Sequence, residues 1–168
     1  MLLGTALAVQ GATSESIAQM TEAARLRPNS AKVHDKFGIV LSRFLETKVA
    51  GKEFEKAIAL DPTLADAHIN LALIQAQAGE LELAAEHLDR AIQLLGNTPA
   101  AAYPHFVRAK IWGAKNGIGR SIDELQKAVE LRPGYAEAWS DLGEMRRFDG
   151  DRDGAEEALK KAGRVESE

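Results

Sequence analysis

Apolar and small residues recur along the chain at the spacing of one face of an α-helix, and the pattern restarts after each of four prolines. The segments that lead into these prolines, such as Ala-Ile-Ala-Leu-Asp before Pro62 and Ala-Val-Glu-Leu-Arg before Pro133, are amphipathic. Such a helix ends at the proline, because proline lacks the N–H that would continue the hydrogen bonding. The pattern predicts ten helices, over residues 1–10, 14–26, 31–45, 48–60, 65–78, 81–94, 100–115, 118–131, 135–148 and 151–164.

The prolines also define equivalent positions in a repeated unit. They divide the chain into segments of 34, 37 and 34 residues, and they are Pro28, Pro62, Pro99 and Pro133. Six residues after each proline stands a flat, bulky side chain: His34, His68, His105 and Trp139. Small residues recur where two helices would pack closely: Ala57, Ala91, Ala128 and Ala162. Each unit is therefore predicted to be a helix, a turn and a second helix.

This spacing resembles that of a known family. A hairpin of 34 residues with a bulky residue, then Leu-Gly, and later Ala, Phe or Leu, Ala and Pro resembles the tetratricopeptide repeat. The best match is Pro133-Gly-Tyr-Ala-Glu-Ala-Trp139-Ser-Asp-Leu142-Gly143, and Leu3-Gly4 occupies the same place relative to Pro28 as Phe37-Gly38 does relative to Pro62. The resemblance implies an all-α fold, a right-handed superhelical solenoid of antiparallel helix hairpins.

Three positions depart from the family pattern. Arg108 occupies a Leu position, Leu45 replaces the turn glycine found at Gly79, and Gly96-Asn97-Thr98 adds three residues before Pro99. We expect these departures to alter local geometry and not the fold.

No linker rich in Gly, Ser or Pro interrupts the repeats, so the sequence predicts a single array over residues 1–168. It consists of a partial first repeat over 1–28 and of repeats over 29–62, 63–99, 100–133 and 134–168. The last helix, 154–165, is expected to lack the polar outer face that usually caps a solenoid. Either the chain is part of a longer protein, or its apolar ends associate and form a homo-oligomer through the terminal helices.

Composition narrows the function classes. The chain has 168 residues, of which 45% are hydrophobic and 27% charged, as in an ordinary folded domain. A formal net charge of −4 disfavours binding of nucleic acid, which needs clustered Lys and Arg. The absence of cysteine excludes disulfides, thiol catalysis and thiolate metal sites, but it does not choose between cytoplasm and periplasm. No apolar run reaches the roughly 20 residues of a membrane span, and residues 1–9 lack the basic start of a signal peptide.

Three candidate ligand sites fail on closer inspection. His34, His68 and His105 lie in equivalent positions of successive repeats, too far apart to bind one metal ion, and Trp139 at the fourth position indicates a packing role. Asp149-Gly-Asp151-Arg-Asp153-Gly154 resembles half of a calcium loop, but Lys160 stands where the closing Glu is needed. Asn116-Gly-Ile-Gly119-Arg-Ser lacks the further glycine of a phosphate-binding turn. We therefore predict no catalytic residue, no metal and no cofactor, and the chain is not expected to be an enzyme.

The resemblance instead implies a concave groove, lined by the first helix of each hairpin, that binds a peptide or helix of a partner protein. The groove residues obtained by counting from the prolines are Asp35, Ile39, Arg43, Ile69, Asn70, Leu73, Gln77, Tyr103, Phe106, Val107, Lys110, Glu137, Asp141 and Glu144. The apolar ones in the middle would either receive hydrophobic side chains of the partner or pack between helices. Glu137, Asp141 and Glu144 are expected to face Lys or Arg of the partner.

The sequence thus predicts a noncatalytic protein-interaction module, part of a bacterial-type scaffold. Tetratricopeptide proteins that hold a chaperone's C-terminal carboxylate share only Asn70 with this groove, so a cochaperone of that kind is disfavoured. Two alternatives remain open: a structural element that self-assembles through its ends, and an accessory domain of a larger enzyme.

Overall fold

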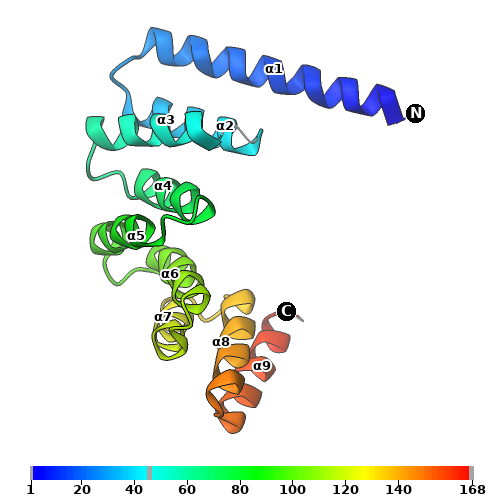
Figure 1. Ribbon diagram of the computed structural model, residues 1–168, viewed down its shortest axis with the longest axis vertical. Helices are drawn as coiled ribbons and strands as arrows, with labels where there is room; N and C mark the ends of the chain where they lie inside the picture. The colour runs from blue at the N-terminus through cyan, green and yellow to red at the C-terminus, as the bar shows by residue number, and fades with distance from the viewer. Residues whose placement is uncertain (1, 45–46, 167–168) are drawn as a thin grey trace. The chain divides into compact units, whose positions relative to one another are not determined.

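The computed structural model describes residues 2–44 and 47–166, and it describes side chains over 14–44 and 47–165. Every regular element in these ranges is helical, and none is a strand (Figure 1). The elements are α1 (Leu2–Leu26), α2 (Ala31–Arg43), α3 (Thr47–Leu60), α4 (Ala65–Gln77), α5 (Leu81–Leu95), the 3-10 helix η1 (Pro99–Ala101), α6 (Ala102–Ala114), α7 (Ile118–Leu131), α8 (Ala136–Asp149) and α9 (Arg152–Glu166). The predicted all-α fold is confirmed.

The chain divides into two compact units, Met1–Glu80 and Leu81–Glu168, with the division between α4 and α5. The organisation as a single array over 1–168 stays a prediction. Within the described parts of both units, no helix is long and apolar enough to cross a membrane.

In the first unit, α1 packs on α2, α2 on α3, and α3 on α4. The core consists of four buried residues from three helices: Leu41, Ala50, Phe54 and Leu71. A Cβ atom on Gly38 of α2 would come within 2.5 Å of the Phe54 ring. The glycine therefore lets α2 lie directly against the phenyl group of α3, as the small-residue position of the repeat predicts.

The first helix differs from the prediction. The sequence predicted two helices, over 1–10 and 14–26, whereas α1 runs without a break from Leu2 to Leu26. The residues between the two predicted helices, Gly11, Ala12 and Thr13, include no proline, and a single glycine in a helix costs only about 1 kcal/mol. Local sequence therefore gives no reason for the helix to stop. The proposed packing role of Leu3-Gly4 concerns side chains outside the described residues, as does the turn position of Leu45.

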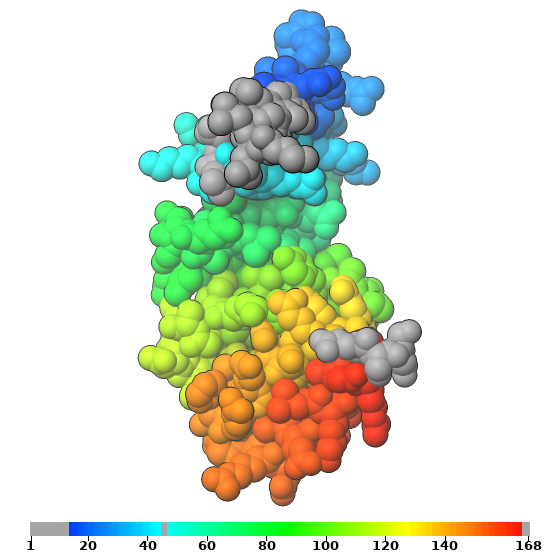
Figure 2. Space-filling model, turned by 90° about the vertical axis from the view of Figure 1, so that its right-hand side faces the viewer, coloured from blue at the N-terminus to red at the C-terminus, as the bar shows by residue number. Residues whose placement is uncertain are grey.

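In the second unit, α5 packs on α6, and the hairpins α6–α7 and α8–α9 pack together through α7 and α8. Figure 2 shows α8, in orange, and α9, in red, covering one continuous face. The large side chains at its centre are among the least exposed in the protein: Leu88, Leu125, Val129 and Leu142. Alanines fill the close contacts between them, including Ala109, Ala128 and Ala158.

The turns end helices as the sequence predicted. Gly79 and Gly150 have φ angles of 82° and 91°, a left-handed conformation that favours glycine. Asn116 also has a positive φ of 56°, and the amide N–H of Gly117 donates to the Trp112 carbonyl at 2.8 Å. This N–H therefore closes the end of α6, which supports a tight turn over a phosphate site. In the other candidate loop, the Gly154 N–H donates to Asp151 Oδ1 at 2.9 Å, the helix-capping role.

The last helix does not match the expectation of an apolar outer face. Four of its outward residues are exposed and charged, and they form ion pairs one turn apart, Glu156 with Lys160 and Glu157 with Lys161. The buried side of α9 carries alanines instead, among them Ala155 and Ala158. α9 thus has the polar outer face that a terminal repeat requires.

Candidate protein-binding surface

The flat side chains six residues after the prolines have a structural role. Nε2 of His34 lies 3.0 Å from the Pro28 carbonyl oxygen, and Nε2 of His68 lies 3.2 Å from that of Pro62. The indole N–H of Trp139 donates to the carbonyl of the proline six residues before it, at 2.8 Å. A ring N–H thus satisfies a carbonyl freed at the turn. No group of three metal-binding side chains occurs among the described residues.

Two of these histidines also contact a glutamate that the sequence analysis missed. Nδ1 of His34 lies 2.6 Å from Glu53 Oε2, and Nδ1 of His105 lies 2.7 Å from Glu124 Oε2. Both glutamates stand 25 residues after the proline of their repeat. This shared offset, at a position that faces the neighbouring helix, is the signal that would have found them.

Arg108, which departs from the family pattern, joins the second of these pairs. Its guanidinium donates to both carboxylate oxygens of Glu124, at 2.8 Å, and also contacts Asp89. Burial of Glu124 opposes its ionisation, but the hydrogen bonds from His105 and Arg108 outweigh burial and lower the pKa of Glu124 to about 2. A charged cluster therefore replaces the leucine of the other hairpins.

In the first unit, the predicted groove residues form a polar link between successive repeats. The side-chain amide of Asn70 in α4 donates to Asp35 of α2 at 2.9 Å. Burial raises the pKa of Asp35, while the bond from Asn70 acts in the opposite direction. Ile69 is buried, and Ile39 packs against the core cluster. The exposed or half-buried groove residues of this unit are Arg43, Leu73 and Gln77.

In the second unit, the predicted aromatic residues lie beside one that was not predicted. The rings of Phe106 and Tyr135 are 5.0 Å apart at an angle of 45°, a favourable tilted contact. Lys110 Nζ lies 4.9 Å above the Phe106 ring. Burial, together with the nearby charge of Glu137, raises the pKa of Tyr135 to about 12. Phe106 is buried, as is Val107, whereas Tyr103 is 37% exposed and accessible to a partner.

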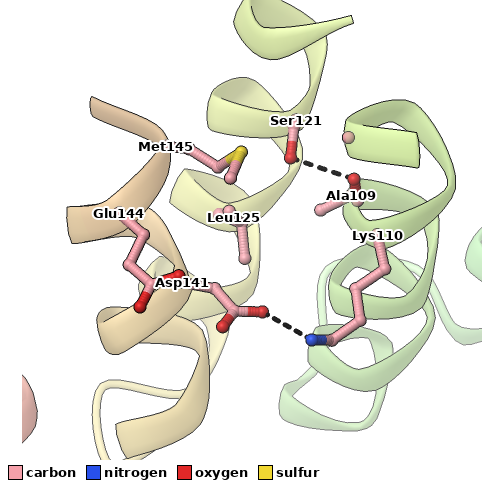
Figure 3. Close-up of a pocket in the computed structure, with 8 residues that line it drawn as sticks. Ala109, Lys110, Ser121, Leu125, Asp141, Glu144 and Met145 are labelled. Atoms are coloured by element: carbon pink, nitrogen blue, oxygen red, sulfur yellow. Dashed lines mark hydrogen bonds and ion pairs between the residues drawn. The ribbon is translucent and has the colours of Figure 1, made fainter. Parts of the chain in front are cut away.

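A hollow of about 290 Å³ opens between α6 and α8 over α7 (Figure 3). Three predicted residues line it, and Lys110 spans it by an ion pair of 2.9 Å to Asp141, with Glu144 one turn further along α8. The structure therefore brings Lys110, Asp141 and Glu144 together. Five lining residues were not predicted: Ala109, Gly113, Ser121, Leu125 and Met145.

Gly113 is the reason for the hollow that sequence could have suggested. It stands 14 residues after Pro99, where the other repeats carry Ser42, Ala76 and Arg147. A Cβ atom on Gly113 would lie 3.7 Å from Ser121 Oγ and 3.9 Å from Met145 Sδ, at ordinary contact distance. The missing side chain thus leaves open space and not a forced close approach.

Comparisons with known proteins agree with the fold. Residues 53–86 match the family model described as tetratricopeptide repeat. A crystal structure of MamA superposes with a TM-score of 0.83 at 23% identity, over 99% of this chain and 96% of that chain. The corresponding values for pilF of Pseudomonas aeruginosa are 0.84, 18%, 98% and 73%. For YrrB, described as a TPR protein with an unusual peptide-binding site, they are 0.71, 21%, 98% and 83%.

The sequence comparison with curated proteins finds no match. The structural similarities, all at low identity, concern the fold. The resemblance to tetratricopeptide repeat proteins, predicted from the proline-led spacing, is confirmed.

Proposed function

We propose that this chain, with its tetratricopeptide-repeat fold, is a noncatalytic module that binds an extended or helical segment of a partner protein along the first helices of its hairpins. The observation that carries the proposal is the hollow between α6 and α8, which opens on the face predicted for the groove. Tetratricopeptide neighbours support a protein-interaction role in general, and one of them, YrrB, is described as having a peptide-binding site.

Accessible side chains of different kinds surround this face in the second unit. Tyr103 offers an exposed aromatic ring, and Glu137 and Glu144 are exposed carboxylates. Aromatic residues are favourable contact points in interfaces, because they bury a large area and lose little conformational freedom. The buried Phe106 and Val107 support the face from below.

A selection of random twelve-residue peptides displayed on phage, with the full chain as bait, tests the proposal. Selected peptides are synthesised with a fluorescent label, and their Kd is measured by fluorescence anisotropy. We expect Tyr103→Ala to weaken binding about threefold to tenfold. Leu83→Ala, at a side chain that is 47% exposed on the second helix α5, is the matched control and should leave Kd unchanged.

The proposal fails if no peptide is enriched over an unrelated helical bait. It also fails if the enriched peptides bind equally well to the wild-type chain and to variants of both units, Tyr103→Ala and Leu73→Ala.

Self-association through the terminal helices has less support, because the outward side of α9 is charged. We expect light scattering after size-exclusion chromatography to give a constant mass near 18.1 kDa across concentration. A mass that rises with concentration would favour the self-assembling alternative.

A further inference from the structure

We infer that the hollow of the second unit receives an aliphatic side chain of the partner, and that Glu144 and Glu137 hold a Lys or Arg close to it in the same segment. This inference rests on the proposed function and specifies the chemistry of the partner.

The floor of the hollow suits an aliphatic group. Leu125 and Met145 supply apolar surface, and the Ser121 hydroxyl already donates to the Ala109 carbonyl at 2.9 Å, so it is not left seeking a ligand. A cavity of roughly 150 Å³ is enough to bind benzene. The hollow, at about 290 Å³, therefore has room for the side chain of Leu, Ile or Met.

The rim is acidic. Glu137, Asp141 and Glu144 are spaced i, i+4 and i+7 along α8, so they lie on one face of the helix. Asp141 is paired with Lys110. Glu137 and Glu144 are exposed and have no ion pair with any residue that the structure describes. Two uncompensated carboxylates beside an apolar hollow attract a cation and repel an acidic segment.

Lys110 does not reverse this polarity. Its ammonium group is shared between the Asp141 carboxylate and the Phe106 ring, at 2.9 Å and 4.9 Å. An anionic group of a partner would have to displace Asp141 from it. The complementary partner is thus a protein segment with Lys or Arg, and not a phosphate or a free C-terminal carboxylate.

The geometry also limits the spacing within the partner. Glu144 itself lines the hollow, so the basic residue must lie within about one helical turn of the aliphatic one. Glu137 is seven residues earlier, about 10 Å along the axis of α8. A second basic residue two turns away in a partner helix could reach it.

The phage-selected peptides test the inference directly. We expect them to share an aliphatic residue within four positions of a Lys or Arg. Gly113→Leu places a side chain in the hollow without a clash of its Cβ, and it should weaken binding about tenfold. Gly119→Leu, where an added Cβ meets no atom within 4 Å, is the matched control and should bind as the wild-type chain does. Circular dichroism verifies the helix content of both variants.

The charge is tested by exchange. Glu144→Lys should weaken the basic peptide about tenfold, and a peptide with Glu in place of its Lys or Arg should bind this variant better than it binds the wild-type chain. Glu86→Lys, at an exposed glutamate of α5, is the control. Such a swap cannot arise from misfolding, because it restores binding.

The outcomes separate the two proposals. Peptides that lose affinity with Tyr103→Ala or Leu73→Ala, but tolerate both Gly113→Leu and Glu144→Lys, overturn the inference and leave the proposed function standing. Enrichment of acidic peptides also overturns the inference alone. Indifference to all four substitutions, or no enrichment, overturns both.

Discussion

The hairpins α6–α7 and α8–α9 of the second unit occupy equivalent places in the repeat but are held together by different forces. The residue of the first helix that faces the hairpin interior is Arg108 in one and Leu142 in the other, 34 residues apart. Opposite them stand Glu124 and Ala158. The first hairpin buries a charged cluster, and the second buries an apolar contact. One backbone arrangement therefore accepts either solution.

The two solutions place different demands on the neighbouring residue. In α8, a Cβ atom on Gly143 would lie 2.7 Å from Leu159 Cγ and 3.1 Å from the Ala155 carbonyl oxygen. The equivalent residue of α6 is Ala109, which is fully buried and accommodated. The apolar hairpin thus depends on close approach of its helices, while the charged hairpin tolerates one more methyl group. Hydrogen-bonding geometry replaces tight packing as the source of specificity.

The largest effect should come from breaking the charged cluster. Glu124→Ala leaves Arg108 and His105 without the carboxylate that both contact, and removal of one partner of a buried ion pair costs about 3 to 5 kcal/mol. We expect a much lower urea midpoint, monitored by circular dichroism. A loss below about 1 kcal/mol, comparable with an exposed pair, would show that the cluster contributes little.

A pH series should separate the two hairpins next. The pKa of Glu124 is lowered from 4.5 to about 2, so its stabilising effect is present above pH 4.5 and is lost as the pH falls toward 2. The difference in stability between the wild-type chain and Glu124→Gln should therefore shrink by up to about 3 kcal/mol over this range. Urea unfolding of both proteins at each pH measures it. A difference that stays constant with pH would contradict the assignment.

A smaller loss is expected from crowding the apolar hairpin. Gly143→Ala forces Leu159 and the α9 backbone to move, at a cost of about 1 to 3 kcal/mol. The reciprocal change, Ala109→Gly, is the matched comparison in α6 and should cost about 1 kcal/mol through helix propensity. Equal effects of the two substitutions would mean that the hairpins are packed alike.

The smallest effect should follow from converting one hairpin into the other. The double variant Arg108→Leu with Glu124→Ala removes both charges and supplies the residues of α8–α9. Replacing a buried ion pair by apolar groups is often neutral, so we expect stability within about 1 kcal/mol of the wild-type chain. A double-mutant cycle with the two single variants gives the coupling energy. A double variant as unstable as Glu124→Ala would show that the slot requires charge.

Much of this fold could be predicted from the sequence because its information is local and repeated. The prolines mark helix ends, and the flat residue six positions later recurs in four copies. The continuous α1 was missed because the prediction extended the repeat pattern to a segment without a helix breaker. Periodicity describes which face of a helix is apolar, but it does not show whether the local chain will turn.

The candidate site was harder to predict, since it depends on contacts between segments. Lys110, Asp141 and Glu144 were predicted by offset and are indeed neighbours. The floor of the hollow was not, because it belongs to the second helix and to a missing side chain at Gly113. Likewise, Arg108 was recognised as a departure, but its partner Glu124 is known only once the hairpin has folded.

The bond from a ring N–H to a proline carbonyl has a consequence for how such chains grow. Donor and acceptor lie six residues apart within one repeat, as in Trp139 and Pro133. Duplication of a single repeat therefore copies the closed turn with it, and no residue of an older repeat has to change. Phe at this position would preserve the shape but lose the donor. The chain thus carries, in each copy, the means of joining one more.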